Sequence, residues 1–301
     1  MCPVELPEEY PVVPNEAPPV LRLTPPRVSK RSTVASASVF GLRGDLRVGA
    51  VRVDARTVDY SEGSVHHRLF RASGGIQHRD VSRWMRGDPH RSFEVSNREA
   101  VRLAQQIARA VPEVSGRTEG PAVVKRLHVA SSSKDGKSRS DSVTHVAVQF
   151  RRAERGIPVE GPGGMVTLFV HPDGHSSGFD LLWRPVSKVF RESLDLVDAR
   201  DVVERVIRDW WRRGLRTGRV TRVRFGYLEL DWTANQRLLQ PAYVVFGLFQ
   251  DPSGKTRFGR IEAVHASASP AGPLLPPRPR LERAFPERHD ASGHVATRTK
   301  P

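Results

Sequence analysis

Two short stretches combine residue types that could bind a phosphate or a metal. "GPGG" at Gly161 to Gly164 has the glycine content of a phosphate loop, and His171 and His175 in "HPDGH" are four residues apart. A phosphate loop needs a helix behind it, usually with a Lys or Thr at its start, but the strand-like "MVTLFV" follows. A Pro-Asp-Gly turn need not bring two histidine rings together, and no third ligand lies nearby. We predict neither a cofactor nor a metal here.

Candidate catalytic residues form no recognisable set. The Gly-x-Ser-x-Gly motif of a serine nucleophile is absent, and the Ser-, Lys- and Asp-containing segment 130–142 has the composition of a flexible hairpin tip. Asp180, Glu229 and Asp231 lie near tryptophans, as in sugar-binding sites, but the sequence does not fix their separations. We therefore predict no catalytic residue and a protein that is not an enzyme.

Arginines are concentrated between residues 200 and 224, which contain nine of them. On a helix, three of these would lie opposite the apolar stripe and could follow a phosphate backbone. Asp201 and Glu204 stand four residues before arginines, so ordinary ion pairs along the helix are the alternative interpretation. The candidate residues for binding nucleic acid or another polyanion are Arg205, Arg208, Arg212, Arg213, Arg222 and Arg224.

Composition sets the class of protein. The 301 residues are 38% hydrophobic, which is enough for a core, and the single cysteine excludes an internal disulfide framework. The net charge of +15 favours an acidic partner, although a GC-rich bacterial genome would also enrich arginine. No apolar run could span a bilayer, and the acidic, proline-rich start differs from a signal peptide. We expect a cytoplasmic protein for the chain as written, or an extracytoplasmic one if its natural N-terminus is longer.

Three segments have a helical period. In residues 96–111, Ser96 and Glu99 form a capping box ahead of apolar residues spaced by three and four. Residues 198–213 begin at Asp198, end before Gly214, and place on one face Val203, Val206, Ile207 and Trp210. The serine-rich segment 28–44 keeps the same period with weaker helix formers.

Each helical segment is followed by several short alternating segments that predict antiparallel strands. Consecutive strands without intervening helices indicate an α+β fold and disfavour a parallel nucleotide-binding sheet. The predicted fold has tandem units of one helix followed by a three- to four-stranded antiparallel sheet, between disordered proline-rich termini. The predicted boundaries are a disordered start (1–26), three units (27–95, 96–190 and 191–266) and a disordered tail (267–301).

The stretch between Phe150 and Trp183 is predicted to double back as paired strands. Its glycines and Asp-Gly pair then serve as bends and tight turns, where positive φ is tolerated, and not as ligand contacts. The residues predicted to shape this hairpin are Gly156, Pro158, Gly161, Gly164, Asp173 and Gly174.

This order of strand, Gly-Ile-Pro-Val, glycine-rich bend, apolar strand and Asp-Gly turn resembles the core of PepSY-like domains. That group includes the propeptide domain of thermolysin and fungalysin proteases and the paired domains of regulators that bind a cell-wall-sensing histidine kinase. The match is close around residues 154–186 and loose over residues 97–266. The matching residues are Gly156, Ile157, Pro158, Val159, Gly164, Val166, Leu168, Val170, Asp173 and Gly174.

The resemblance implies a non-catalytic module that binds, inhibits or regulates another protein. No His-Glu-x-x-His motif is present, so a target would act in trans. The chain departs from most members of the group because it shows no export signal or membrane anchor. We expect an unidentified protein partner, with nucleic acid or an anionic polymer as the alternative.

Overall fold

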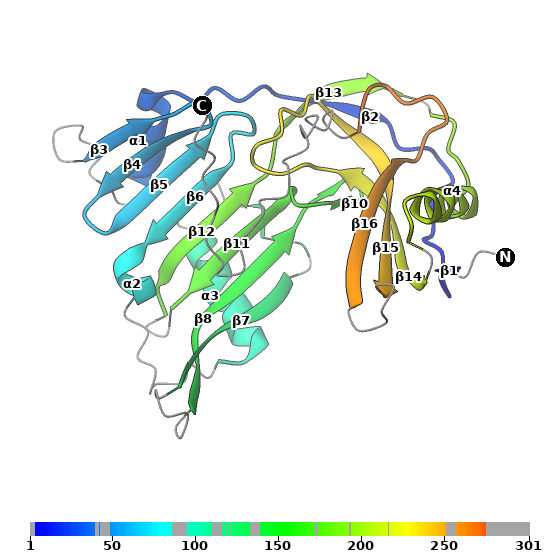
Figure 1. Cartoon of the computed structure of the whole chain (residues 1–301). Helices are drawn as coiled ribbons and strands as arrows, with labels where there is room; N and C mark the ends of the chain where they lie inside the picture. The colour runs from blue at the N-terminus through cyan, green and yellow to red at the C-terminus, as the bar shows by residue number, and fades with distance from the viewer. Residues whose placement is uncertain are drawn as a thin grey trace, which may run out of the picture.

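The protein is built on two β-sheets that lie next to each other (Figure 1). The computed structural model describes residues 4–39, 42, 49–85, 95–109, 116–118, 120, 122–132, 139–171, 174–192, 194–215, 217–250 and 257–274. Four helices lie in this part of the chain: α1 (Lys30–Val39), α2 (Val81–Met85), α3 (Asn97–Arg109) and α4 (Ala199–Arg212). None of these four is long and apolar enough to cross a membrane.

The first sheet has eight strands, and every neighbouring pair is antiparallel. In spatial order they are β3 (Ala50–Val53), β4 (Thr57–Glu62), β5 (Val65–Phe70), β6 (Ile76–Asp80), β12 (Ser176–Leu182), β11 (Met165–Val170), β8 (Arg139–Arg151) and β7 (Ala122–Ser132).

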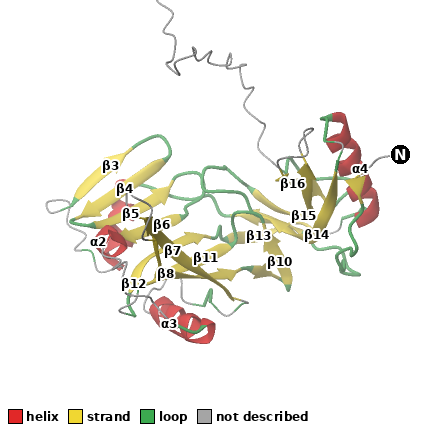
Figure 2. Cartoon of the chain, turned by 60° about the horizontal axis from the view of Figure 1, so that its bottom comes forward, coloured by secondary structure: helices red, strands yellow, loops and turns green. Residues whose placement is uncertain are grey.

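Helices α1 and α3 cover the same face of the first sheet. On β5, His67 contacts Ser36 of α1, and Leu69, two residues on, belongs to the cluster that α3 buries. Side chains two apart in a strand share a face, so both helices lie on one side. Figure 2 shows α3 against the strands β7, β8 and β11. The small residues Ala100, Ala104 and Ala108 bring α3 close to the sheet.

The second sheet is mixed. Its main path is β13 (Val186–Arg191), β2 (Val20–Leu23), β15 (Leu238–Gln250), β14 (Gly218–Leu228), β10 (Ile157–Glu160) and β9 (Ala153–Glu154). In addition, β16 (Arg257–His265) pairs with β15, and β1 (Val4–Glu5) pairs with β14. The pairs of β1 and β10 with β14 are parallel, and the others are antiparallel.

One face of the second sheet packs against α4. Val203, Val206 and Trp210 of the helix meet Val223 and Phe225 of β14 in one core cluster. Trp210 fits closely because Gly247 of β15 has no side chain; a Cβ there would lie 2.8 Å from the indole ring.

The structure confirms several sequence predictions. Helix α3 follows Ser96, whose Oγ accepts from the Glu99 N–H at 3.1 Å, and α4 follows Asp198, which caps Arg200. Strands β8, β11 and β12 pair as the expected antiparallel run, with β11 beginning directly after Gly164. The α+β class is confirmed, but the expected tandem units are not evident, because β3–β6 of the first expected unit and β7, β8, β11 and β12 of the second form one continuous sheet.

The prediction of a disordered start is wrong for residues 4–26. Strand β2 lies inside the second sheet between β13 and β15, with Val20, Leu21 and Leu23 buried. Prolines precede and follow this strand, but none lies within it. A proline-rich window therefore does not exclude a short strand between its prolines.

The predicted disorder of the tail is corrected in the same way for residues 267–274. Ser267 bridges to Leu196, and Leu274 packs in a core cluster with Leu228 and Val244. Residues 275–301, with most of the "PLLPPRPR" segment, lie outside the described part of the chain.

The buried position of β2 gives a stability prediction. We expect Leu21→Ala to lower the free energy of unfolding by about 2–5 kcal/mol, because it opens a cavity inside the sheet. The adjacent Arg22 is exposed, so Arg22→Ala should change stability by less than about 1 kcal/mol. Urea unfolding of the full chain measures both; similar small effects would show that residues 20–23 do not belong to the sheet.

Candidate functional site

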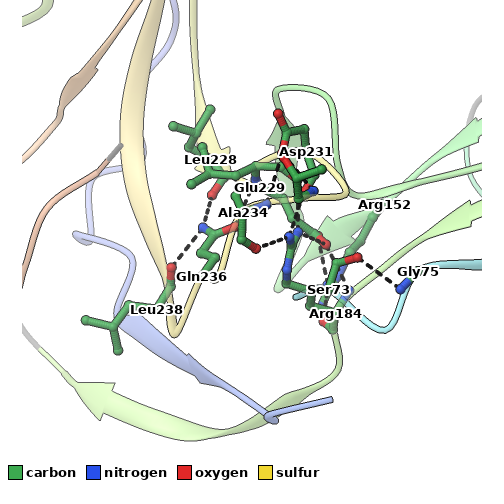
Figure 3. Close-up of polar contacts among 12 residues, drawn as sticks. Ser73, Gly75, Arg152, Arg184, Leu228, Glu229, Asp231, Ala234, Gln236 and Leu238 are labelled. Carbon is green, nitrogen blue, oxygen red and sulfur yellow. Dashed lines mark hydrogen bonds and ion pairs between the residues drawn. The ribbon is translucent and has the colours of Figure 1, made fainter. Parts of the chain in front are cut away.

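The most deeply buried charges lie where the two sheets meet (Figure 3). Arg152 and Arg184 are 1% exposed, and Glu229 is 0% exposed. Glu229 Oε2 accepts from Arg152 Nη1 at 3.2 Å, and Oε1 accepts from Arg184 Nη1 at 3.3 Å and from the Arg184 N–H at 2.8 Å. Arg152 follows β8 of the first sheet, whereas Glu229 follows β14 of the second. These three residues, named here the junction cluster, therefore connect the sheets.

The remaining donors of Arg184 hold the connection between β14 and β15. Its guanidinium donates to the carbonyls of Leu230 (2.9 Å), Asp231 (2.6 Å) and Ala234 (2.8 Å). Gln236 closes the same loop, because its amide donates to Leu228 and Leu238 and accepts from the Leu230 N–H. The planar fork of arginine allows one side chain to satisfy several carbonyls.

The glycine-rich bend packs against Glu229. A Cβ on Gly163 would lie 2.5 Å from Glu229 Cγ, and one on Gly161 would lie 2.6 Å from the Glu229 carbonyl oxygen. Gly164 has a φ of +64° and leaves room for Val159. The glycine-rich bend that follows β10 is thus packed against Glu229, which follows β14 of the same sheet.

The junction cluster is built to hold structure. Burial raises the pKa of Glu229, while the Arg184 amide and the two guanidiniums oppose that shift and favour the carboxylate. All three residues are closed to solvent, so the cluster has no access for a substrate. The cluster therefore has a structural role: it fixes the position of β14 relative to the first sheet.

The carboxylates considered for acid–base chemistry are separated. Asp180 on β12 pairs with Arg79 at 2.6 Å, and burial raises its pKa. Glu229 belongs to the junction cluster, and Asp231 is exposed and accepts from the N–H groups of Thr233 and Ala234. Glu229 and Asp231 both accept from Arg184, but Asp231 does so through its main-chain carbonyl, whereas Asp180 pairs with Arg79.

His171 and His175 lie at the turn between β11 and β12. Their main chains close that turn, with the His171 N–H donating to the His175 carbonyl at 2.9 Å, and Gly174 has a φ of +80°. Asp173 lies outside the described residues. Within the described ranges, no group of three His, Cys, Asp or Glu side chains is placed to hold a metal ion.

Two other histidines form a buried pair beneath α1. The Nδ1 atoms of His67 and His78 lie 3.4 Å apart, His67 Nε2 lies 3.0 Å from Ser36 Oγ, and His78 stacks on Phe179. Burial lowers the pKa of His67 to about 3 and that of His78 to about 4. Both rings are neutral at physiological pH, so the pair acts as a polar element of the core.

The six candidate arginines do not form one surface. Arg205, Arg208, Arg212 and Arg213 are exposed around α4, and the last two pair with Asp209 and Glu262, each at 3.3 Å. Arg222 and Arg224 project from the opposite face of the sheet, because Val223 and Phe225 between and beside them face α4.

The edge of β14 opposite β15 is paired only at its two ends among the described residues. β1 pairs with Gly218 and Arg219, and β10 pairs with Tyr227 and Leu228. Figure 1 shows β1 and β10 at opposite ends of β14. Pro7 follows β1 and Pro158 precedes Val159 in β10, and proline has no N–H with which to continue either pairing. Seven residues, Val220–Gly226, lie between these two pairings, and the central five, Thr221–Phe225, are named here the edge gap.

The main-chain groups of the edge gap can be assigned from its neighbours. The Glu229 N–H donates to the Glu160 carbonyl of β10, and Tyr227 lies opposite Pro241 of β15, which cannot donate. Hydrogen-bonding direction alternates along a strand, so Val223 and Phe225 also direct their N–H and C=O groups toward the open edge. Their side chains are buried, but these main-chain groups are available to a further strand.

A groove of about 550 Å³ runs along part of the edge gap. One wall is Arg219–Val223 of β14, and the other is the N-terminal segment Glu5–Pro11. A second cavity of about 340 Å³ continues from Arg219 toward Gln250 and Arg257. The edge gap is therefore bordered by a recess of a size that proteins use for ligands.

Sequence reasoning identified neither the junction cluster nor the edge gap. Glu229 was considered only as an acid–base candidate, and Arg152 and Arg184 were not considered at all. An arginine inside an apolar stretch, as in "VQFRRAE" and "LLWRPV", is the one signal that could have indicated a buried ion pair.

Comparisons with known proteins add no function. No family model matches the chain, and no curated protein matches it in sequence. Among solved structures, the chain is similar to an uncharacterized protein from Eubacterium rectale ATCC 33656, determined at 1.45 Å resolution. The identity is 10%, the TM-score is 0.47, and the match covers 88% of each chain. A likeness at this level does not define the fold or the activity.

The junction cluster predicts a large loss of stability when its carboxylate is replaced by an uncharged amide of the same shape. We expect Glu229→Gln to lower the free energy of unfolding by about 3–5 kcal/mol, because it removes the carboxylate that the two buried guanidiniums share. Glu154 also pairs with Arg152 but is 23% exposed, so Glu154→Gln should have a clearly smaller effect. Denaturant unfolding of both variants checks this; equal losses would contradict a joint centred on Glu229.

The buried histidine pair predicts acid sensitivity. The pKa values of His67 and His78 in the folded state lie below the usual 6.5. The folded protein therefore keeps its full stability above pH 6.5 and loses stability as the pH falls toward 4. At pH 5 we expect a loss of about 2 kcal/mol per histidine. In His67→Gln/His78→Gln the difference between the unfolding free energies at pH 7.5 and pH 5 should be clearly smaller than in the natural protein. In the exposed control His66→Gln the full pH dependence should persist.

Proposed function

We propose that this protein is a non-catalytic binding module that regulates a protein partner in trans by accepting an extended segment on the edge of β14. The edge gap carries the proposal, since its main-chain groups in the middle of β14 pair with no other strand in the described part of the chain. Strand addition to a sheet edge obtains its affinity from such groups and its specificity from neighbouring side chains.

The rigidity of the site supports this function. Glu229 follows β14 directly, and the junction cluster fixes it between two arginines. On the other side, β15 pairs with β14 from Gly218 to Leu228. A strand held in this way loses little conformational freedom when a partner segment pairs with it, which favours binding.

The resemblance to PepSY-like domains supports the same class of function. The residues that carry the resemblance lie at the β9–β10 turn, in β10, and in and around β11 and β12. Each of α1, α3 and α4 precedes a set of strands in chain order. We infer that these three segments are related units, with the first two merged into one sheet. In such domains the expected activity is holding another protein.

Polyanion binding is the second candidate function, and the exposed arginines of α4 favour it. Arg205 and Arg208 lie on the outer side of the helix, away from the sheet. Binding to a nucleic acid through this surface would weaken steeply with salt and would be lost when both residues become glutamate. It would not depend on the main chain of β14.

A peptide selection tests the proposed function. We expect a display library of random peptides of about 12 residues, longer than the edge gap, to yield sequences that bind the full-length protein. Val223→Pro should abolish their binding, because it removes an N–H that faces the open edge and is not needed by β15.

The matched control is Val223→Ala, which shortens the same side chain but keeps the N–H. It should retain the selected peptides, and thermal unfolding of both variants checks that the sheet is intact. Selected peptides that bind Val223→Pro as well as the natural protein would refute strand addition at this edge.

A further inference from the structure

Basic side chains border the edge gap on one side, and acidic side chains border it on the other. A bulge between Val220 and Arg222 interrupts the alternation of β14, so that Arg219 and Arg222 project from the same face, away from α4. Across the ladder they lie beside Leu248 and Phe246 of β15. Both arginines are exposed, and neither has an ion-pair partner among the described residues. One side of the edge gap therefore has two available positive charges.

A third arginine on that face is already engaged. Arg224 donates to Glu160 of β10 at 3.2 Å and lies over the Phe246 ring. It therefore marks the end of the available positive surface, where β10 covers the edge. The charge that a partner segment would meet on this face comes from Arg219 and Arg222.

The other side of the edge gap is acidic. The segment that forms the far wall of the groove contains Glu8 and Glu9, both exposed. It leads directly to Tyr10, which packs in the α4 cluster with Arg200 of that helix over its ring. Glu8 and Glu9 therefore border the edge gap from the α4 side, opposite to Arg219 and Arg222.

Side chains of an added strand would point alternately to these two sides, whichever direction the strand runs. We propose, resting on the function proposed above, that the edge gap selects an extended segment of a partner protein in which acidic and basic residues alternate. The acidic residues lie beside Arg219 and Arg222, and the basic residues lie beside Glu8 and Glu9. Charge pattern, not net charge, is then the basis of recognition.

A polyanion would fit this arrangement poorly. A nucleic acid or an acidic tail would find two arginines on one side but two carboxylates on the other, and like charges brought together are unfavourable. The length of the edge gap, about 16 Å for five residues in a strand, also suits a short peptide segment.

Two synthetic peptides of identical composition test the inference. One has ten residues that alternate Glu and Lys, and the other has five Glu followed by five Lys, each with a fluorescent label. By fluorescence anisotropy at about 0.1 M salt, we expect the alternating peptide to bind the full-length protein at least about tenfold more tightly. N-methylation of alternate peptide groups should remove that binding, because the paired main-chain donors are lost.

Charge reversal on each wall provides the decisive comparison. Arg219→Glu/Arg222→Glu and Glu8→Lys/Glu9→Lys should each weaken the alternating peptide by about tenfold, because both walls then have the same sign. The variant with all four substitutions again has walls of opposite charge, with the two signs exchanged. The alternating peptide can adapt to it by shifting one residue along β14, so its affinity should return to that for the natural protein. Arg205→Glu/Arg208→Glu on α4 should change nothing.

Each other result overturns the inference. Equal affinity for the two peptides, or no binding of either, would remove charge alternation as the basis of recognition. The proposed function would still stand if the selected library peptides depended on Val223. A single-stranded oligonucleotide that bound more tightly than the peptide, and was lost in Arg219→Glu/Arg222→Glu, would identify a polyanion surface instead.

Discussion

A single buried carboxylate between two guanidiniums determines how this chain is assembled. Moving charges out of water is unfavourable by several kcal/mol per ion, so such a group is tolerated only where its partners are complete. Glu229 has three donors from two residues, and the glycine-rich bend closes over it because a Cβ at Gly161 or Gly163 would collide with it. The stability of each part of this arrangement therefore depends on the others: the bend, both arginines and the end of β14 all contact the same carboxylate residue.

The exposed edge of β14 is a consequence of that constraint. With Glu229 fixed, the adjacent Leu228 and Tyr227 pair with β10, which the chain reaches directly from the first sheet through Arg152. Pro158 then ends this pairing, and Pro7 ends the pairing of β1 at the other end. Prolines and a bulge are also devices that protect sheet edges from aggregation. Here they limit the exposed part to a length that one short segment can fill.

The sequence predicted what local patterns control and missed what distant contacts control. Helices α3 and α4 carry their own caps and apolar stripes, and the β11–β12 hairpin carries its own turn glycine, Gly174, so each could be read within one window. Strand β2 could not, because its neighbours β13 and β15 lie far along the chain. The same holds for Arg184 and Glu229, which are 45 positions apart in the chain and look like ordinary surface charges in the sequence.

The arginines illustrate why composition alone misleads about binding. A window from residue 200 to 224 suggests one basic surface, but the helix and the strand that it contains pack face to face. Side chains on β14 alternate between the two faces of the sheet, so Arg222 and Arg224 point away from the arginines of α4. The bulge between Val220 and Arg222 places Arg219 on the same face as Arg222 and Arg224. The N-terminal segment contributes carboxylates to the same groove from more than 200 residues away in sequence. A net charge of +15 therefore coexists with a groove of mixed sign, and it is the local pattern that a partner would meet.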